Sequence, residues 1–176
     1  MTTKTRLCLG CGLTPNPAYL NVDIRASKDV DVVSDIRTVQ FPPESFIEII
    51  AKDVLEHVSF TEAKKLLRNC YGWLQPKGVI VIHFQNMRFC AAKLAESNED
   101  NEDCTFEVLR WIYGTPGEGD TDYLHGWHRW GYTKESICKI LRGIGFKIVD
   151  THVTCNGFGL LVIACKDGVD SAEETE

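Results

Sequence analysis

Residues 7–24, LCLGCGLTPNPAYLNVDI, decide the fold because two strand-like segments stand there with little chain between them. The first apolar run ends in glycines, as before a nucleotide-binding turn, and an acidic residue closes the second run. Only CGLTPNPA separates the two, and Pro15 and Pro17 favour extended or turn backbone over a helix. The stretch is therefore either a shortened cofactor site or an apolar hairpin that contains two glycines.

The composition is typical of a soluble globular protein with one domain. The 176 residues are 44% hydrophobic and 25% charged, and their number suffices for a sizeable core. A net charge of −6 requires no basic surface, so we expect neither a nucleic-acid partner nor a membrane partner. The N-terminal MTTKTRLCLG lacks the apolar segment of a signal peptide, which predicts a cytoplasmic protein.

Eight cysteines are explained best as free thiols in a reducing compartment. We expect Cys8, Cys155 and Cys165 to be buried in strands, and Cys70 and Cys138 on apolar helix faces. Cys8 is also the first residue of a CxxC motif, but no second pair follows to complete a zinc site. The sequence thus predicts no metal site.

Short apolar runs alternate with helical patterns along the chain, which predicts an α/β fold with a mostly parallel, Rossmann-like sheet. The clearest helix follows Ser59, which has capping-box spacing to Glu62, and a second opens at Thr133. The last two strands are joined by a few residues only, so we expect an antiparallel C-terminal hairpin. The first crossover helix is predicted to be reduced or missing. The predicted strands are 6–10, 19–24, 30–34, 46–51, 79–84, 146–154 and 158–165.

The chain is expected to form a single domain over residues 1–166. Residues 87–132 form an insertion that we expect to act as a substrate lid, because glycines and aromatic residues gather in its second half. The alternative is that these aromatic side chains pack the insertion onto the sheet. The acidic tail, 167–176, has no apolar period and is predicted to be disordered.

Polar and small residues follow four of the predicted strands. Gly10 and Gly12 come after the first strand, Asp23 closes the second, Asp35 follows the third, and residues 53–57 follow the fourth. Open parallel sheets bind ligands beyond the carboxyl ends of their strands, so these residues mark one candidate site. Each also has an ordinary structural explanation, such as a tight turn, a solvent-exposed strand end or a cap.

Five motifs in this order resemble those of the class I S-adenosylmethionine-dependent methyltransferases. More narrowly, the chain is similar to small methyltransferase-domain proteins whose first motif reads LxLGCG…NVDI. The resemblance covers most of residues 6–85, and the antiparallel hairpin near 146–165 matches the family's seventh strand. The motifs are LCLGCG (7–12), NVDI (21–24), VVSDI (32–36), IIAKDVLEHV (49–58) and WLQPKG (73–78).

The resemblance implies S-adenosyl-L-methionine as the cofactor and assigns residues to its methionine and ribose parts. Gly10, Cys11 and Gly12 would lie against these parts, and Asp23 would accept the ribose hydroxyls. Asp53 stands where the family contacts the methionine end or the substrate.

For the adenine, the resemblance implies three further residues. Ile24 would pack on the ring, Asp35 would bond to the amino group, and Ile36 would lie beside the ring.

Histidine is the natural general base for a methyl acceptor, because its ordinary pKa is near neutrality. His57 and His128 are the catalytic candidates, and His125 is a weaker one. The alternative for His57 is a structural, hydrogen-bonded histidine at the start of a helix.

We expect methyl transfer to an oxygen or nitrogen of a small-molecule or glycan-like acceptor. No Asp/Asn-Pro-Pro-aromatic motif follows the fourth strand, which disfavours methylation of base amino groups. The alternative is a non-catalytic cofactor-binding module or a subunit that works with a protein partner or a second copy. An NAD-dependent enzyme is disfavoured, since Asp23 follows the glycines too soon.

Overall fold

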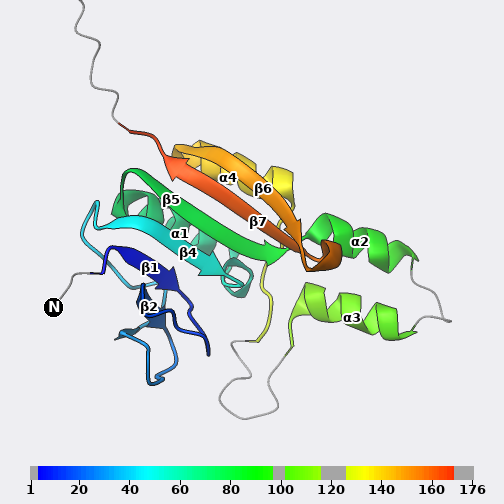
Figure 1. Cartoon of the computed structure of the whole chain (residues 1–176). Helices are drawn as coiled ribbons and strands as arrows, with labels where there is room; N and C mark the ends of the chain where they lie inside the picture. Colours follow the sequence, from blue (N-terminus) through cyan, green and yellow to red (C-terminus); the bar gives the residue numbers. More distant parts are fainter. Residues whose placement is uncertain (1–3, 97–101, 116–125, 169–176) are drawn as a thin grey trace, which may run out of the picture.

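The computed structural model describes residues 4–96, 102–115 and 126–168, and these form one seven-stranded sheet with helices (Figure 1). The order of the strands across the sheet is β3-β2-β1-β4-β5-β7-β6. The strands are β1 Arg6–Leu9, β2 Leu20–Asp23, β3 Val32–Val33, β4 Phe46–Lys52, β5 Leu74–Gln85, β6 Phe146–Thr154 and β7 Gly159–Lys166.

The pairing confirms the predicted fold class. The five strands from β3 to β5 are parallel, whereas β7 lies antiparallel between β5 and β6. A short 3₁₀ turn joins β6 to β7, and this connection is too short for a parallel crossover. The helices are η1 Leu55–His57, α1 Phe60–Trp73, α2 Met87–Glu96, α3 Glu102–Tyr113, α4 Lys134–Ile144 and η3 Cys155–Gly157.

Helices α1 and α4 cover the same face of the sheet (Figure 1). The predicted capping box of α1 is present, since Ser59 and Glu62 bond to each other's backbone amides. The apolar stripes of both helices pack on strand residues such as Ile49 and Ile82, which are fully buried. This layer contains the hydrophobic core.

The opposite face has no helix among the described residues. The segments 10–19, 24–31 and 34–45, which connect β1 to β2, β2 to β3 and β3 to β4, contain only turns and irregular backbone. Ile50, Val81 and Ile163 stand side by side in register on this face, and each stays half-buried. The prediction of a missing first crossover helix is thus confirmed, and the next two crossovers lack helices as well.

Helices α2 and α3 lie beyond the carboxyl end of β5 and contact each other (Figure 1). Phe158, in the hairpin between β6 and β7, anchors them, because Phe89 meets its ring edge-on and Trp111 stacks on it. The insertion therefore packs on the hairpin in part, as the alternative to a lid requires. Residues 116–125 of the proposed lid and residues 169–176 of the tail lie outside the described residues.

The cysteines follow the sequence prediction only in part. Cys8, Cys70 and Cys138 are buried and free, and burial raises the pKa of the Cys8 thiol to about 12. Cys165 is only half-buried, and Cys155 is exposed in η3. The prediction that Cys155 is buried is therefore wrong, because the chain leaves the sheet just before this residue to form the turn.

Within the described ranges, no helix combines the length and apolar character that crossing a membrane requires.

We predict that Ile82→Ala lowers the free energy of unfolding by about 2–5 kcal/mol, because the side chain is fully buried between the sheet and its helices. Val153→Ala is the matched control, since Val153 is 65% exposed and should change the value by less than about 0.5 kcal/mol. Urea unfolding of both variants measures the difference. Equal losses would contradict the position of the core.

Candidate functional site

The loop after β1 folds back onto the end of β2. The amides of Gly10 and Cys11 both bond to the carbonyl of Val22, and the amide of Gly12 donates to Oδ2 of Asp23 at 2.7 Å. Both glycines have positive φ angles, +64° and +57°, which residues with a β-carbon rarely adopt. The loop predicted to contact the cofactor is thus held by its own backbone.

Asp23 is a buried carboxylate that bonds to the backbone on both sides of it. Its side chain is 7% exposed, and Oδ1 accepts a bond from the amide of Arg25 at 2.9 Å while Oδ2 holds Gly12. Its position next to the glycine loop suits a ribose-binding carboxylate, because the remaining lone pairs of its oxygens can accept hydrogen bonds from hydroxyl groups. No helix follows β1, and the bond from Gly12 to Asp23 holds the turn that stands in its place.

The glycine loop lies directly against the end of β4. A β-carbon at Gly10 would stand 2.6 Å from Cγ2 of Val54, so only glycine fits at this contact. Since Val54 follows Asp53, the contact brings the cofactor loop next to the residues after the fourth strand.

The residues predicted for the adenine lie on the β3 side. Asp35 forms an ion pair with Arg37, which also reaches Glu62 of α1. These three residues border a pocket of about 300 Å³. Ile24 is 41% exposed near the glycine loop, as a ring-stacking residue would be, whereas Ile36 packs partly against the core. Their cofactor roles stay predictions.

Asp53 bonds to a histidine that the sequence analysis missed. Nδ1 of His83 donates to Oδ1 of Asp53 at 2.6 Å, and Nε2 lies 2.8 Å from Oγ1 of Thr154. His83 and Gln85 interrupt the apolar residues at the end of β5, and this interruption was the available signal. The carboxylate of Asp53 is nearly half-exposed, so one of its faces can contact a ligand.

Glu56 is the second missed residue and is completely buried. Its Oε1 accepts a bond from Nε2 of Gln85 at 2.6 Å, but Oε2 has no hydrogen-bond partner among the described residues. Burial raises the pKa of this carboxyl to about 7. The hydroxyl of Tyr132 is also buried without a partner in the described part, and the nearby Glu56 adds to the burial that raises the pKa of this phenol. Such groups are rare in folded proteins and call for an explanation.

The two predicted catalytic histidines come together although they are far apart in the chain. Their rings meet edge-on with centroids 5.0 Å apart. Nδ1 of His57 donates to the carbonyl of Trp127, and Nδ1 of His128 donates to the carbonyl of Trp111, each at 3.1 Å. Burial and the neighbouring His57 lower the pKa of His128, so this imidazole is neutral at neutral pH. His125 lies outside the described residues.

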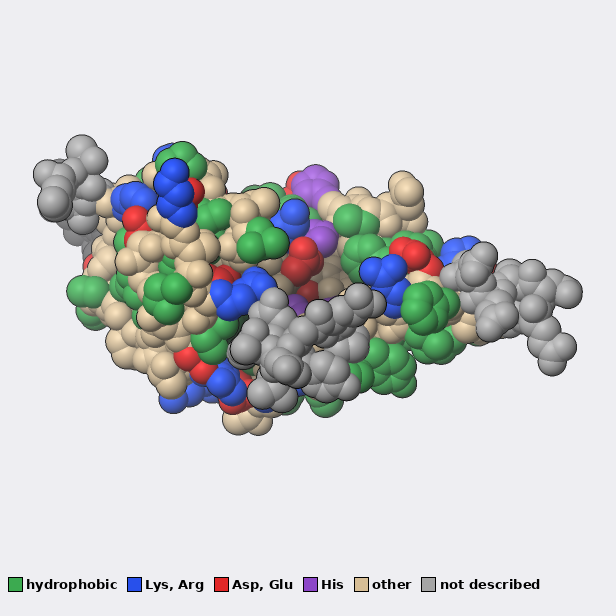
Figure 2. Space-filling model, turned by 90° about the horizontal axis from the view of Figure 1, so that it is seen from below, with side chains coloured by type: hydrophobic (Ala, Val, Ile, Leu, Met, Phe, Trp, Pro, Cys, Tyr) green, Lys and Arg blue, Asp and Glu red, His purple; other side chains and the backbone are tan. Residues whose placement is uncertain are grey.

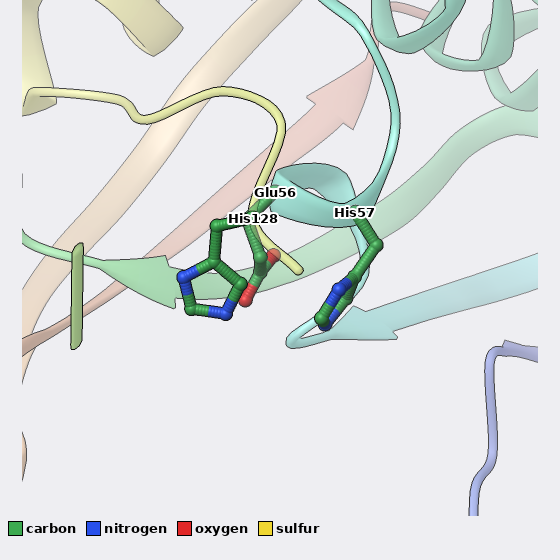
Figure 3. Close-up of side chains that lie close together, drawn as sticks. All are labelled: Glu56, His57 and His128. Atoms are coloured by element: carbon green, nitrogen blue, oxygen red, sulfur yellow. The ribbon is translucent and has the colours of Figure 1, made fainter. Parts of the chain in front are cut away.

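Glu56 lies between the two histidines (Figure 3). Glu56 and His57 come from η1, while His128 comes from the segment that leads to α4. One ligand atom of each residue lies within 4.8 Å of those of the other two.

On the surface, histidine and acidic side chains gather near the middle of the face in Figure 2, beside lysine and arginine. Trp127, whose carbonyl accepts the bond from His57, is 39% exposed. Trp130, whose amide bonds to the carbonyl of Glu56, is 48% exposed and also packs on Phe60. The aromatic residues of the insertion are thus partly packed, like Trp111 on Phe158, and partly exposed.

Comparison with known proteins finds similarity to methyltransferases. Residues 5–82 match a family model described as a methyltransferase domain. Across the whole chain, a crystal structure of an S-adenosylmethionine-dependent methyltransferase from Mesorhizobium loti aligns with a TM-score of 0.60 and 19% identity, covering 92% of this chain and 90% of that one. The chain shares its fold with this methyltransferase. The resemblance inferred from the sequence motifs is confirmed.

Two other proteins with this fold or domain are informative. The phosphoethanolamine N-methyltransferase of Plasmodium falciparum is 33% identical over 76 residues, which are 43% of this chain and 26% of that protein. This chain thus spans about a quarter of the length of that relative. The 1,6-didemethyltoxoflavin-N1-methyltransferase of Burkholderia thailandensis, solved with S-adenosylhomocysteine bound, aligns with a TM-score of 0.61 and 15% identity over 92% of this chain and 70% of that one.

In this methyltransferase fold, Gly10→Ala should destabilise the protein more than Gly12→Ala. Both substitutions strain a positive φ, but only Gly10 would also press on Val54, while the nearest atom at Gly12 is 3.8 Å away. We expect a loss of about 1–3 kcal/mol in unfolding free energy for Gly10→Ala.

Val54→Ala in the Gly10→Ala background should recover part of this loss, because it removes the methyl group in contact. A double-mutant cycle by urea unfolding measures the recovery. Purely additive losses would show that the two loops do not touch.

Proposed function

We propose that this chain transfers a methyl group from S-adenosyl-L-methionine to an oxygen or nitrogen of a small-molecule or glycan-like acceptor. The observation that carries the proposal is the contact between Gly10 and Val54. It joins a cofactor-type loop, closed by Asp23, to the segment that holds Asp53, Glu56 and His57. A methyl donor bound at the glycine loop and an acceptor bound at the segment after β4 would therefore meet.

The residues present fit the cofactor. The backbone of Gly10, Cys11 and Gly12 offers a surface without side chains, as close contact with a ligand requires, and Asp23 supplies a fixed carboxylate for ribose hydroxyls. When bound, S-adenosylmethionine supplies a methyl group on a positively charged sulfur that needs no further activation. The protein then has to align the acceptor with this group and to manage the acceptor's proton.

We assign the acceptor side to His57 and His128. Their rings meet edge-on, and the exposed Trp127 and Trp130 are bonded through their backbones to His57 and Glu56. They act either by accepting the proton of the acceptor or by holding a cation that activates it. The aromatic side chains suit a flat or apolar acceptor part, which they would shield from water.

The comparisons support the chemistry more firmly than the acceptor. A methyltransferase-domain match and neighbours with the methyltransferase fold favour methyl transfer, and one neighbour is described with S-adenosylhomocysteine bound. The relative named for phosphoethanolamine is matched over 26% of its length, so its acceptor is no guide to that of this chain. The glycan-like acceptor, the lid role of 87–132 and the cytoplasmic location stay predictions.

A non-catalytic cofactor-binding subunit is the second candidate. The sheet face around Ile50, Val81 and Ile163 favours it, because no helix of the described residues covers this face and a protein partner or a second copy could do so. Incubation with cofactor carrying a labelled methyl group, in cell extract, separates the two. Label in an acceptor supports the enzyme, and binding without any transfer supports the subunit.

We predict that Asp23→Ala weakens binding of S-adenosylmethionine and S-adenosylhomocysteine at least tenfold, because it removes the ribose carboxylate and releases Gly12. Asp29→Ala is the matched control, since this exposed carboxylate lies in the adjoining turn. Isothermal titration calorimetry measures both, with NAD as a ligand that should not bind. If the wild type binds neither sulfur compound at millimolar concentration, the proposed function is wrong.

A further inference from the structure

We infer that Glu56, His57 and His128 bind a divalent transition-metal ion of the zinc class. One ligand atom from each residue lies within 4.8 Å of the other two. Three such atoms surround a point within about 2.8 Å of each, so side-chain shifts of under an ångström reach the zinc distances of about 2.0–2.2 Å. No other group of three such residues with this spacing occurs in the part of the chain that the structure describes.

The carboxylate of Glu56 points to a missing ligand. The residue is fully buried, and Gln85 fixes Oε1 while Oε2 has no hydrogen-bond partner among the described residues. A buried oxygen without a hydrogen-bond partner lowers the stability of the fold, and coordination of a metal ion offsets this loss. In Figure 3 the carboxylate points to the space between the two imidazole rings.

The histidines carry the second feature of a metal site. A carbonyl oxygen can only accept, so the bonds from Nδ1 of His57 and His128 to Trp127 and Trp111 put the ring proton on Nδ1. The nitrogen that can bind a metal ion is then Nε2 in each ring. Metal-binding histidines usually have this arrangement, in which a backbone carbonyl orients the ring from behind.

Backbone bonds hold the three ligands in place without help from a metal. The carbonyl of Glu56 accepts bonds from the amides of Arg129 and Trp130, at 2.6 and 3.3 Å. The amide of His128 bonds in turn to the carbonyl of Tyr113. The segment with His128 is therefore attached to η1 and to the end of α3, so the site is largely preformed.

Two imidazoles and one carboxylate select the kind of ion. Nitrogen ligands suit Zn²⁺, Co²⁺ and Fe²⁺, whereas Mg²⁺ prefers six oxygen ligands in a strict octahedron. With three protein ligands the ion keeps an open position, as in catalytic zinc sites. The site is thus expected to bind Zn²⁺ and Co²⁺ and to ignore Mg²⁺.

The open coordination position allows the ion to activate the methyl acceptor, and this inference rests on the proposed function. An acceptor hydroxyl that coordinates there is more acidic, and its proton leaves to solvent. Its oxygen lone pair forms the new bond to the methyl carbon, while the electron pair of the carbon–sulfur bond returns to sulfur. The products are a methyl ether and a neutral thioether, so the favoured acceptor is an oxygen compound.

The test is a calorimetric titration of the chelator-treated chain with Zn²⁺ or Co²⁺ in the absence of cofactor. We expect one ion per chain with the wild type. His57→Ala, His128→Ala and Glu56→Gln should each weaken binding at least about 100-fold. His152→Ala is the matched control, because this histidine lies exposed on β6 beside Asp150 and should change nothing.

Absence of stoichiometric binding by the wild type overturns the metal site. So does unchanged binding in the three variants, which would place the ion elsewhere, for example on thiols. If a variant does not fold, nuclear magnetic resonance of the wild-type imidazoles decides. Zn²⁺ should shift the Nε2 signals of His57 and His128 and leave His152 unchanged, and the reverse pattern overturns the site. A bond between Glu56 and Tyr132 without any metal is then the simpler account.

The metal site and the proposed function fail separately. Zinc binding without binding of S-adenosylmethionine would leave the site standing and overturn methyl transfer. Methyl transfer that persists with the metal removed by chelation would overturn the role of the ion in the reaction.

Discussion

The carbonyl oxygen of Glu56 accepts backbone bonds from Arg129 and Trp130, and the rest of the site depends on this contact. It ties the short helix after β4 to a segment that follows the insertion, more than seventy residues later in the chain. Because the bonds use backbone atoms, they depend on the course of the chain and not on particular side chains. They fix the segment with His128 beside η1, where its ring meets that of His57.

The other constraint is the lack of helices between the first four strands. In a parallel sheet a crossover helix usually supports the loop after the first strand through its N-terminus. Here Asp23 does part of this work, since its two oxygens hold the amides of Gly12 and Arg25. The same residue is proposed to bind ribose, so stability of the loop and affinity for the cofactor are coupled. The sheet face that such helices would cover stays half-exposed.

Most strands, the C-terminal hairpin and the helices after Ser59 and Thr133 could be predicted because their signals are local. The signals are Pro15, Pro17 and Gly78, the capping box of Ser59 and Glu62, and the short turn before Phe158, and each acts within a few residues. The strand-end residues Asp23 and Asp53 could be found for the same reason. The exposure of Cys155 could not, since it depends on where β6 leaves the sheet.

Contacts between segments that lie far apart in the chain could not be predicted from the sequence. His57 and His128 could be named separately as candidates, but their approach follows from the packing of the insertion. Glu56 lay unnoticed within LEH, because a glutamate in a short helix usually faces water, and only the fold shows that it is buried. Lone polar residues at the end of β5 were the remaining signal, and their partners Asp53 and Glu56 come from the neighbouring strand end.

The central claim is that the loops after β1 and β2 bind the cofactor and that the loop after β4 adjoins its methyl group. Amide hydrogen exchange with and without S-adenosylhomocysteine tests it most directly, because it reports each loop separately. The account predicts slower exchange in peptides that contain residues 10–12, 23–25 and 53–57, and no change in residues 147–154 of β6. Protection confined to the α1–α4 side of the sheet, or no protection at saturating ligand, would contradict it.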